Sequence, residues 1–307
     1  MGTALTLLSD FLQEYDAALQ WLNRHGVRTE GTRLAAYRRI IARAEAEEAR
    51  GRFEHQEQPE MINAIVEASE IVEIAQIDDA HLAGDDVLDK LRKISGGPAE
   101  MAPDGADPAR DYAFEFHTAA VLEQQSQFGG FSPLGGDLTV GEDQFPTECK
   151  RVSSLNSLRN RLRGGRDKLR ELRDAGSPPG VIAIDLTRPV KSAHGPILAV
   201  DDGEFMREAE QRLIAYLAGH VMTEQNIDTL ASESVLGVIA RCRSAGVSGE
   251  RSNVRRSVVW QACSIHADDS AEDEIFRRIA GAFGPGELRD GTREEIVDAK
   301  VRIAIKQ

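Results

Sequence analysis

The first 95 residues carry apolar side chains at the spacing of amphipathic helices. Apolar residues recur every three or four positions, which places them on one face of a helix. Four stretches show this pattern, marked in turn by Leu5, Leu8, Leu12, Tyr15, Leu19 and Leu22, by Leu34, Tyr37, Ile41 and Ala44, by Met61, Ile65, Ala68, Val72 and Ala75, and by Val87, Leu88, Leu91 and Ile94. The pattern predicts a helical module over residues 1–95, whose first helix ends at Gly26.

A segment rich in Gly, Pro, Ala and Asp, SGGPAEMAPDGADP, follows at residues 95–108 and has no apolar period. Such a composition is typical of an exposed linker. We therefore predict a linker at 96–108 that separates the helical module from a second domain at 109–307. Few contacts are expected between parts of a chain joined in this way.

Beyond the linker, the pattern alternates between helices and short strands. The periodicity predicts helices at residues 110–125, 153–174, 204–221 and 272–283, and strands at 181–186, 235–240 and 258–265. Leu155 begins a row of leucines that marks the predicted core face of the second of these helices. The polar stretch 244–256 is predicted to be a solvated loop, with contact to a substrate as the alternative.

Chemistry-bearing side chains gather in residues 135–152, GGDLTVGEDQFPTECKRV. A Gly-Glu-Asp turn signal separates two short extended runs, so we predict a β-hairpin. Side chains alternate between the faces of a strand, so Glu148 and Lys150 share one face and Cys149 points to the other. The hairpin would bring Asp137 close to them. Two carboxylates beside a lysine form a hard oxygen site of the kind that Mg²⁺ prefers.

These residues resemble the PD-(D/E)XK nuclease superfamily, in particular its bacterial members with an ECKR sequence. Asp137 stands for the D, Glu148-Cys149-Lys150 for the (D/E)XK, and Gly136 replaces the Pro. The superfamily core is a helix, a three-stranded antiparallel unit, a second helix and a fourth strand, and the resemblance covers residues 110–187 in that order. It implies an α/β (α+β) fold in which a restriction-endonuclease-like core with a central mixed sheet flanked by helices follows the N-terminal helical module.

The resemblance also implies roles for the site residues. Asp137 and Glu148 would bind Mg²⁺, or Mn²⁺ in its place, with the Cys149 backbone carbonyl as a further ligand. Glu115 lies where the superfamily often places an additional acidic residue near the metal. The metal and Lys150 would together activate water for cleavage of a phosphodiester.

The helix predicted at 153–174 is basic although the chain has a net charge of −14. Residues 148–174 contain nine Lys or Arg and four acidic residues, whereas residues 1–100 contain 11 Lys or Arg and 19 acidic residues, a net of −8. Nucleic acid is bound largely through its phosphates. The candidate contacts are Arg151, Arg159, Arg163 and Arg166. A solvated arginine face is the alternative.

The candidate site residues also have structural interpretations. Asp137 follows two glycines and would serve equally to cap a turn. Glu148 and Lys150 would form a solvated pair on a half-exposed strand. Glu115, in the first half of a helix, would interact favourably with the helix dipole.

The remaining composition restricts the cellular context. The three cysteines are far apart and form no C-x-x-C motif, so neither a disulfide framework nor a zinc site is predicted. No run approaches eighteen apolar residues and the first residues lack signal-peptide features, so we expect a cytoplasmic protein without a membrane partner.

We therefore expect a Mg²⁺-dependent nuclease that hydrolyses DNA, with RNA as the second choice of substrate. The helical module would mediate a homo-oligomer or bind a partner protein, as in an effector of bacterial anti-phage defence. The opposing class is a non-catalytic interaction module that keeps the nuclease fold. A third class, a phosphoesterase for a small nucleotide, would need a Gly-rich or aromatic base pocket that the sequence does not display.

Overall fold

The computed structural model describes residues 3–48, 50, 59–99, 107–132, 136–195, 197, 201–247 and 253–283. Its strands form one seven-stranded mixed sheet in the order β1-β7-β6-β5-β4-β3-β2. The strands are β1 (Thr3–Leu7), β2 (Phe128–Phe131), β3 (Leu138–Val140), β4 (Phe145–Arg151), β5 (Gly180–Asp185), β6 (Val235–Val247) and β7 (Asn253–Ser264). The central strands β4, β5 and β6 are parallel and the other neighbours are antiparallel. The chain therefore has an α+β fold.

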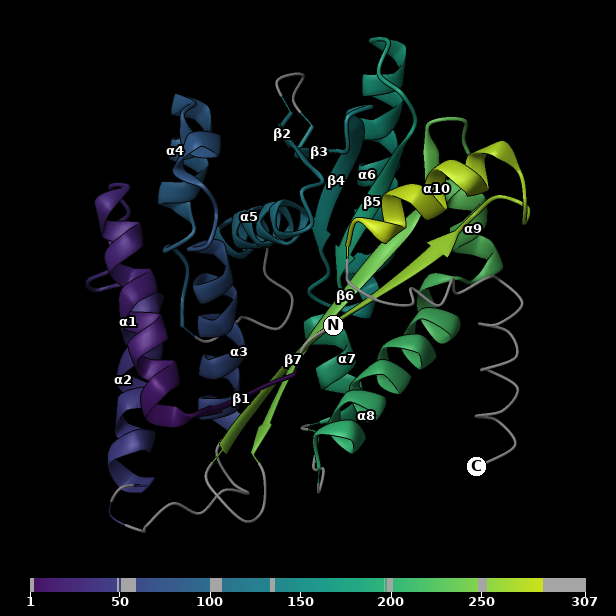
Figure 1. Ribbon diagram of the computed structural model, residues 1–307. Coiled ribbons are helices and arrows are strands. Elements are labelled where there is room, and N and C mark those ends of the chain that lie inside the picture. Colours follow the sequence, from purple (N-terminus) through teal and green to yellow (C-terminus); the bar gives the residue numbers. More distant parts are fainter. Residues whose placement is uncertain are drawn as a thin grey trace.

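Helices cover both faces of this sheet (Figure 1). The helical elements are α1 (Leu8–Arg24), α2 (Arg33–Glu48), α3 (Pro59–Ile74), η2 (Asp79–Leu82), α4 (Asp85–Lys93), α5 (Pro108–Gln124), α6 (Leu155–Asp174), α7 (Thr187–His194), α8 (Asp202–Tyr216), the π-helical turn η3 (Leu217–Val221), α9 (Glu224–Leu230) and α10 (Ala271–Gly281). On β5, Val181 and Ala183 face a core shared with α1 to α5, whereas Ile182 and Ile184 face a core shared with α6 to α9. None of the described helices is long and apolar enough to cross a membrane.

Most of the predicted elements are confirmed, and the differences have local causes. The first helix begins at Leu8 because residues 3–7, including Leu5, form β1, which pairs with the open edge of β7. The stretch predicted as a loop at 244–256 instead extends β6 to Val247 and begins β7 at Asn253, since the two strands continue their pairing; residues 248–252 lie outside the described part. Leu155 is 49% exposed rather than in the core.

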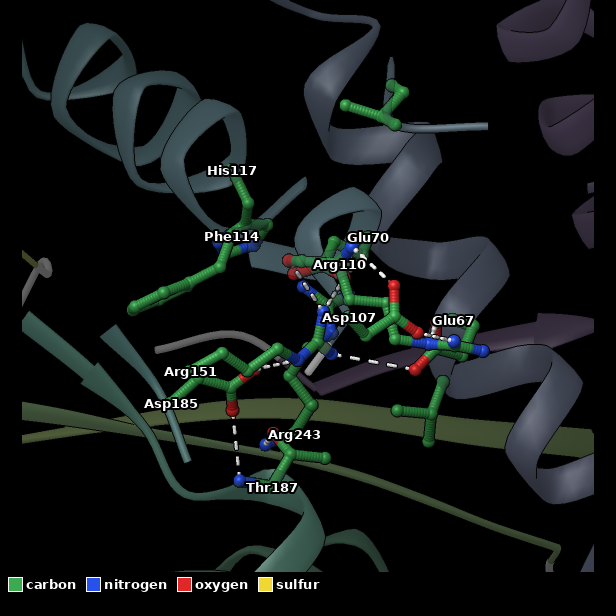
Figure 2. A network of polar contacts seen from close by, with 12 residues as sticks. Glu67, Glu70, Asp107, Arg110, Phe114, His117, Arg151, Asp185, Thr187 and Arg243 are labelled. Carbon is green, nitrogen blue, oxygen red and sulfur yellow. Dashed lines mark hydrogen bonds and ion pairs between the residues drawn. The ribbon is translucent and has the colours of Figure 1, made fainter. Parts of the chain in front are cut away.

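A buried ionic cluster joins α3 to the sheet (Figure 2). Its members are Arg33, Glu67, Glu70, Glu73, Arg110, His117, Arg151, Asp185, Arg241 and Arg243. Arg241 on β6 contacts Glu70 and Asp185 at 2.6 Å each. Arg151 at the end of β4 contacts Glu70 at 3.2 Å and Asp185 at 3.0 Å. Burial is tolerated because each charge has an opposite partner.

This cluster changes the expected relation between residues 1–95 and the rest of the chain. The expectation of few contacts across residues 96–108 is wrong, because three carboxylates of α3 neutralise arginines on α5, β4 and β6. A single apolar core also runs from Leu8 to Phe283. The N-terminal part is helical as predicted, apart from β1, but its helices cover one face of the sheet.

We expect His117 to make the protein less stable as the pH falls. Burial, reinforced by Arg241, lowers the pKa of His117 from 6.5 to about 4, although Glu73 opposes this shift. The unfolded chain therefore binds more protons than the folded one between these two pH values. Because of His117, the free energy of unfolding falls by up to about 3 kcal/mol as the pH falls from 7 to 4.

Urea unfolding at several pH values between 7 and 4 measures this loss. Between pH 7 and 4, His117→Gln should lose about 3 kcal/mol less stability than the wild type, and the two proteins should lose stability in parallel at lower pH, where the cluster carboxylates bind protons. Equal slopes in wild type and variant would show that His117 is not the group responsible.

Candidate active site

The predicted hairpin is formed by β3 and β4. The two strands are antiparallel, with Leu138 opposite Thr147. Asp137 immediately precedes β3, so one further step of this register brings it level with Glu148. The Cys149 N–H donates a 2.7 Å hydrogen bond to Asp137 Oδ2, which fixes that carboxylate against β4.

Lys150 lies between the two carboxylates of the hairpin. Its Nζ is 2.6 Å from Glu148 Oε2 and 3.4 Å from Asp137 Oδ2. Glu148 and Lys150 therefore share a face, as predicted. Cys149 points to the other face and is buried against the core, where burial raises the pKa of its thiol far above the ordinary value. Its side chain is thus a buried apolar group, and the predicted use of its backbone carbonyl as a ligand stays a prediction.

Gly136 allows this close approach. A Cβ at position 136 would lie 3.0 Å from Leu172 Cδ1 and 3.3 Å from Glu148 Oε1. Both contacts are tighter than packed side chains normally make. A larger residue at position 136 would therefore require the Leu172 and Glu148 side chains to shift.

Glu115 reaches the same region from α5. Its side chain is buried and forms a 2.6 Å ion pair with Lys90 on α4. Burial, followed by the charge of Asp137, raises the pKa of Glu115 to about 8 even though Lys90 opposes this. Sequence patterns do not indicate Lys90 as a site residue, because it lies in the part of the chain predicted to be a separate module.

Glu148 is perturbed in the same way. Burial and then Asp137 raise the pKa of Glu148 to about 7, whereas Lys150 and Lys168 lower it. Burial disfavours the charged form of Lys150, but Asp137 and Glu148 outweigh it and raise the Lys150 pKa above its ordinary value. The site thus holds three carboxylates whose mutual repulsion is only partly neutralised by lysines, and such perturbation is characteristic of functional sites.

The donor chemistry of this site fits a hard divalent cation. Glu148 Oε1 is buried and has no hydrogen-bond partner among the described residues. Within the same residues, no group of three or more His, Cys, Asp and Glu side chains is arranged to hold a metal ion. Mg²⁺ commonly keeps several waters and binds only one or two carboxylates. Asp137 and Glu148 supply these two carboxylates.

The predicted nucleic-acid contacts divide into two groups. The prediction that Arg151 contacts nucleic acid at the surface is wrong, because Arg151 is 7% exposed and belongs to the buried ionic cluster. Arg166 is partly buried on α6, where it donates to the Thr229 carbonyl at 2.8 Å and pairs with Asp167. Arg159 is half-buried, whereas Arg163 is exposed. The arginines of α6 therefore do not form one uniform solvated face.

Comparisons of the chain with protein-family models, with curated proteins and with solved structures found no match. We therefore infer function from the geometry of the site residues.

Proposed function

We propose that this chain is a metal-dependent phosphodiesterase of the PD-(D/E)XK type that cleaves nucleic acid, with DNA as the preferred substrate. The observation that carries the proposal is the convergence of Asp137, Glu148 and Lys150 on one hairpin, with an unpartnered buried oxygen on Glu148. Paired carboxylates with a lysine beside them suit hydrolysis of a phosphodiester through bound Mg²⁺.

The topology around the hairpin supports the same proposal. The helix α5 is followed by the antiparallel strands β2, β3 and β4, then by α6 and by β5, which is parallel to β4. This is the order of elements expected from the resemblance. The strand β2 supplies the third member of the antiparallel unit, which the sequence pattern did not reveal.

The chain's own groups have distinct roles in this proposal. Asp137 and Glu148 would hold Mg²⁺, with Glu115 contributing directly or through water. The ion would polarise the scissile phosphate and acidify a water molecule. Lys150 stays charged because of its two carboxylate neighbours. It therefore acts as a fixed positive charge that stabilises the phosphorane, not as a general base.

The direct test is incubation of the full chain with supercoiled, linear and single-stranded DNA and with RNA, in Mg²⁺, Mn²⁺ or EDTA. We expect cleavage of DNA with either ion and none in EDTA. Binding without cleavage under every condition would favour the non-catalytic interaction module. Hydrolysis of small phosphodiesters alone would favour the third class.

Metal binding has its own expected result. A cation that binds only the folded state raises its stability, by about 2.7 kcal/mol at one hundred times the dissociation constant. Addition of Mg²⁺ or Ca²⁺ should therefore raise the melting temperature of the wild type, and Glu148→Gln should lose most of that shift. The matched control is Glu142→Gln, an exposed carboxylate on the turn of the same hairpin. Equal shifts in the two variants would remove Glu148 from the metal site.

A further inference from the structure

A cavity lies away from the candidate active-site residues, between α2, α3 and α7. It has a volume of about 730 Å³, within the range of small-molecule sites. Each helix contributes residues at helical spacing, such as Ala36, Ile40 and Arg43 from α2 and Arg188 and Lys191 from α7. None of the candidate active-site residues lines this cavity.

The lining is cationic although the protein is acidic. It includes five cationic side chains and two carboxylates, a net charge of +3, in a chain whose net charge is −14. The two carboxylates already have partners: Glu60 pairs with Arg43 at 3.2 Å, and Glu67 pairs with Arg110 at 2.9 Å. The remaining charge of the lining is therefore positive.

Two of these cations lack an acidic partner in the described part of the chain. Arg39 donates only to the Ala35 carbonyl, and the Lys191 Nζ donates to Asn63 Oδ1. Burial lowers the pKa of Lys191, although the charge of Glu67 opposes this shift. Among the described residues, Glu67 forms its ion pairs with arginines rather than with Lys191. Both side chains line the same cavity, and phosphate oxygens are suitable acceptors for such donors.

The rest of the lining is largely apolar. Ala36, Ile40, Ala64 and Val66 contribute hydrocarbon surface beside the cations. The inner wall includes Glu67, Arg110 and Thr187, which Figure 2 shows at the buried ionic cluster. A ligand with both a phosphate and an apolar ring would match the two kinds of surface.

We propose that this cavity binds a nucleotide, with its phosphate held by Arg39 and Lys191 and its base against the apolar residues of α2 and α3. The proposal is independent of the nuclease activity proposed above. The nucleotide would join the N-terminal helices to α7, since Arg39 belongs to α2 and Lys191 to α7.

Isothermal titration of the full chain with AMP, pyrophosphate and adenosine tests this assignment. EDTA is present throughout, so that the candidate metal site does not contribute. We expect AMP to bind, pyrophosphate to bind more weakly, and adenosine to bind at least tenfold more weakly than AMP. Absence of AMP binding, or equal affinity for AMP and adenosine, would overturn the proposal.

Variants locate the binding. Arg39→Gln/Lys191→Gln should weaken AMP binding at least tenfold while the melting temperature in the absence of ligand stays near that of the wild type. Arg24→Gln/Arg207→Gln removes two exposed charges that do not line the cavity and should leave the affinity unchanged. Equal weakening in the two double variants would attribute the binding to the overall charge and would contradict the assignment.

Discussion

We expect replacement of Glu148 by alanine, or of Lys150 by alanine, to abolish the proposed metal-dependent cleavage while the protein remains folded. Loss of a metal ligand, or of the charge beside the phosphate, removes several kcal/mol of transition-state stabilisation, on the order of a thousandfold or more in rate. Nuclease assays at saturating metal measure this loss. Far-UV circular dichroism and thermal unfolding report whether the variants fold.

The Glu148→Ala substitution does not leave Lys150 without a charged neighbour. Without Glu148, the Lys150 ammonium still has Asp137 at 3.4 Å and is partly exposed to water. Glu142→Ala, on the same hairpin but exposed, is the control and should keep the wild-type rate. Wild-type activity in Glu148→Ala and Lys150→Ala would contradict the assigned site, whichever substrate is used.

Local patterns predicted the hairpin because a hairpin depends on residues close in sequence. The turn residues and the alternation along 145–152 were sufficient to place Asp137, Glu148 and Lys150 together, and the structure has the same pairing. Lys90 could not be found in this way. Its partner Glu115 lies 25 residues further along the chain on another helix, and no periodicity within either helix indicates that the two helices meet.

The prediction that Arg151 contacts nucleic acid rests on its charge and not on its position along the strand. The alternation that puts Cys149 on the buried face puts Arg151 there as well. The sequence around Arg241 and Arg243 has a similar pattern. The two arginines alternate with Ala240 and Cys242 in an otherwise apolar strand, which places both arginines on the same face. Charged residues on a buried strand face require carboxylate partners. The acidic residues of α3 were the candidates for that role.

Removal of residues 1–106 prevents the remaining fragment from folding. The linker predicted at 96–108 implies that a fragment starting near Asp107 folds independently. In the structure, Arg110, Arg151, Arg241 and Arg243 would lose Glu67, Glu70 and Glu73. Arg110 would keep Asp107, and Asp185 alone would face the other three arginines. Breaking a single buried ion pair costs about 3–5 kcal/mol, and an entire domain is stable by only about 5–15 kcal/mol.

A fragment of residues 107–307 should therefore be insoluble, or should lack a cooperative thermal transition in circular dichroism, and should show no nuclease activity. Co-expression of residues 1–106 and 107–307 as two chains should restore a soluble complex. The chain is then cut just before α5, and all residues of the ionic cluster are present in the complex. A soluble fragment that unfolds cooperatively on its own would contradict this prediction and would reinstate two independent domains.

A point substitution separates the ionic cluster from the loss of apolar contacts that deletion also causes. Glu70 is 1% exposed and contacts both Arg151 and Arg241. Glu70→Gln keeps its shape but removes the charge, so we expect about 3–5 kcal/mol of destabilisation in urea unfolding. Glu60→Gln, on the same helix but exposed, should change stability by less than about 0.5 kcal/mol. If the two variants were equally stable, the cluster would not be what holds α3 against the sheet, and the apolar contacts of α3 would have to account for the failure of the fragment.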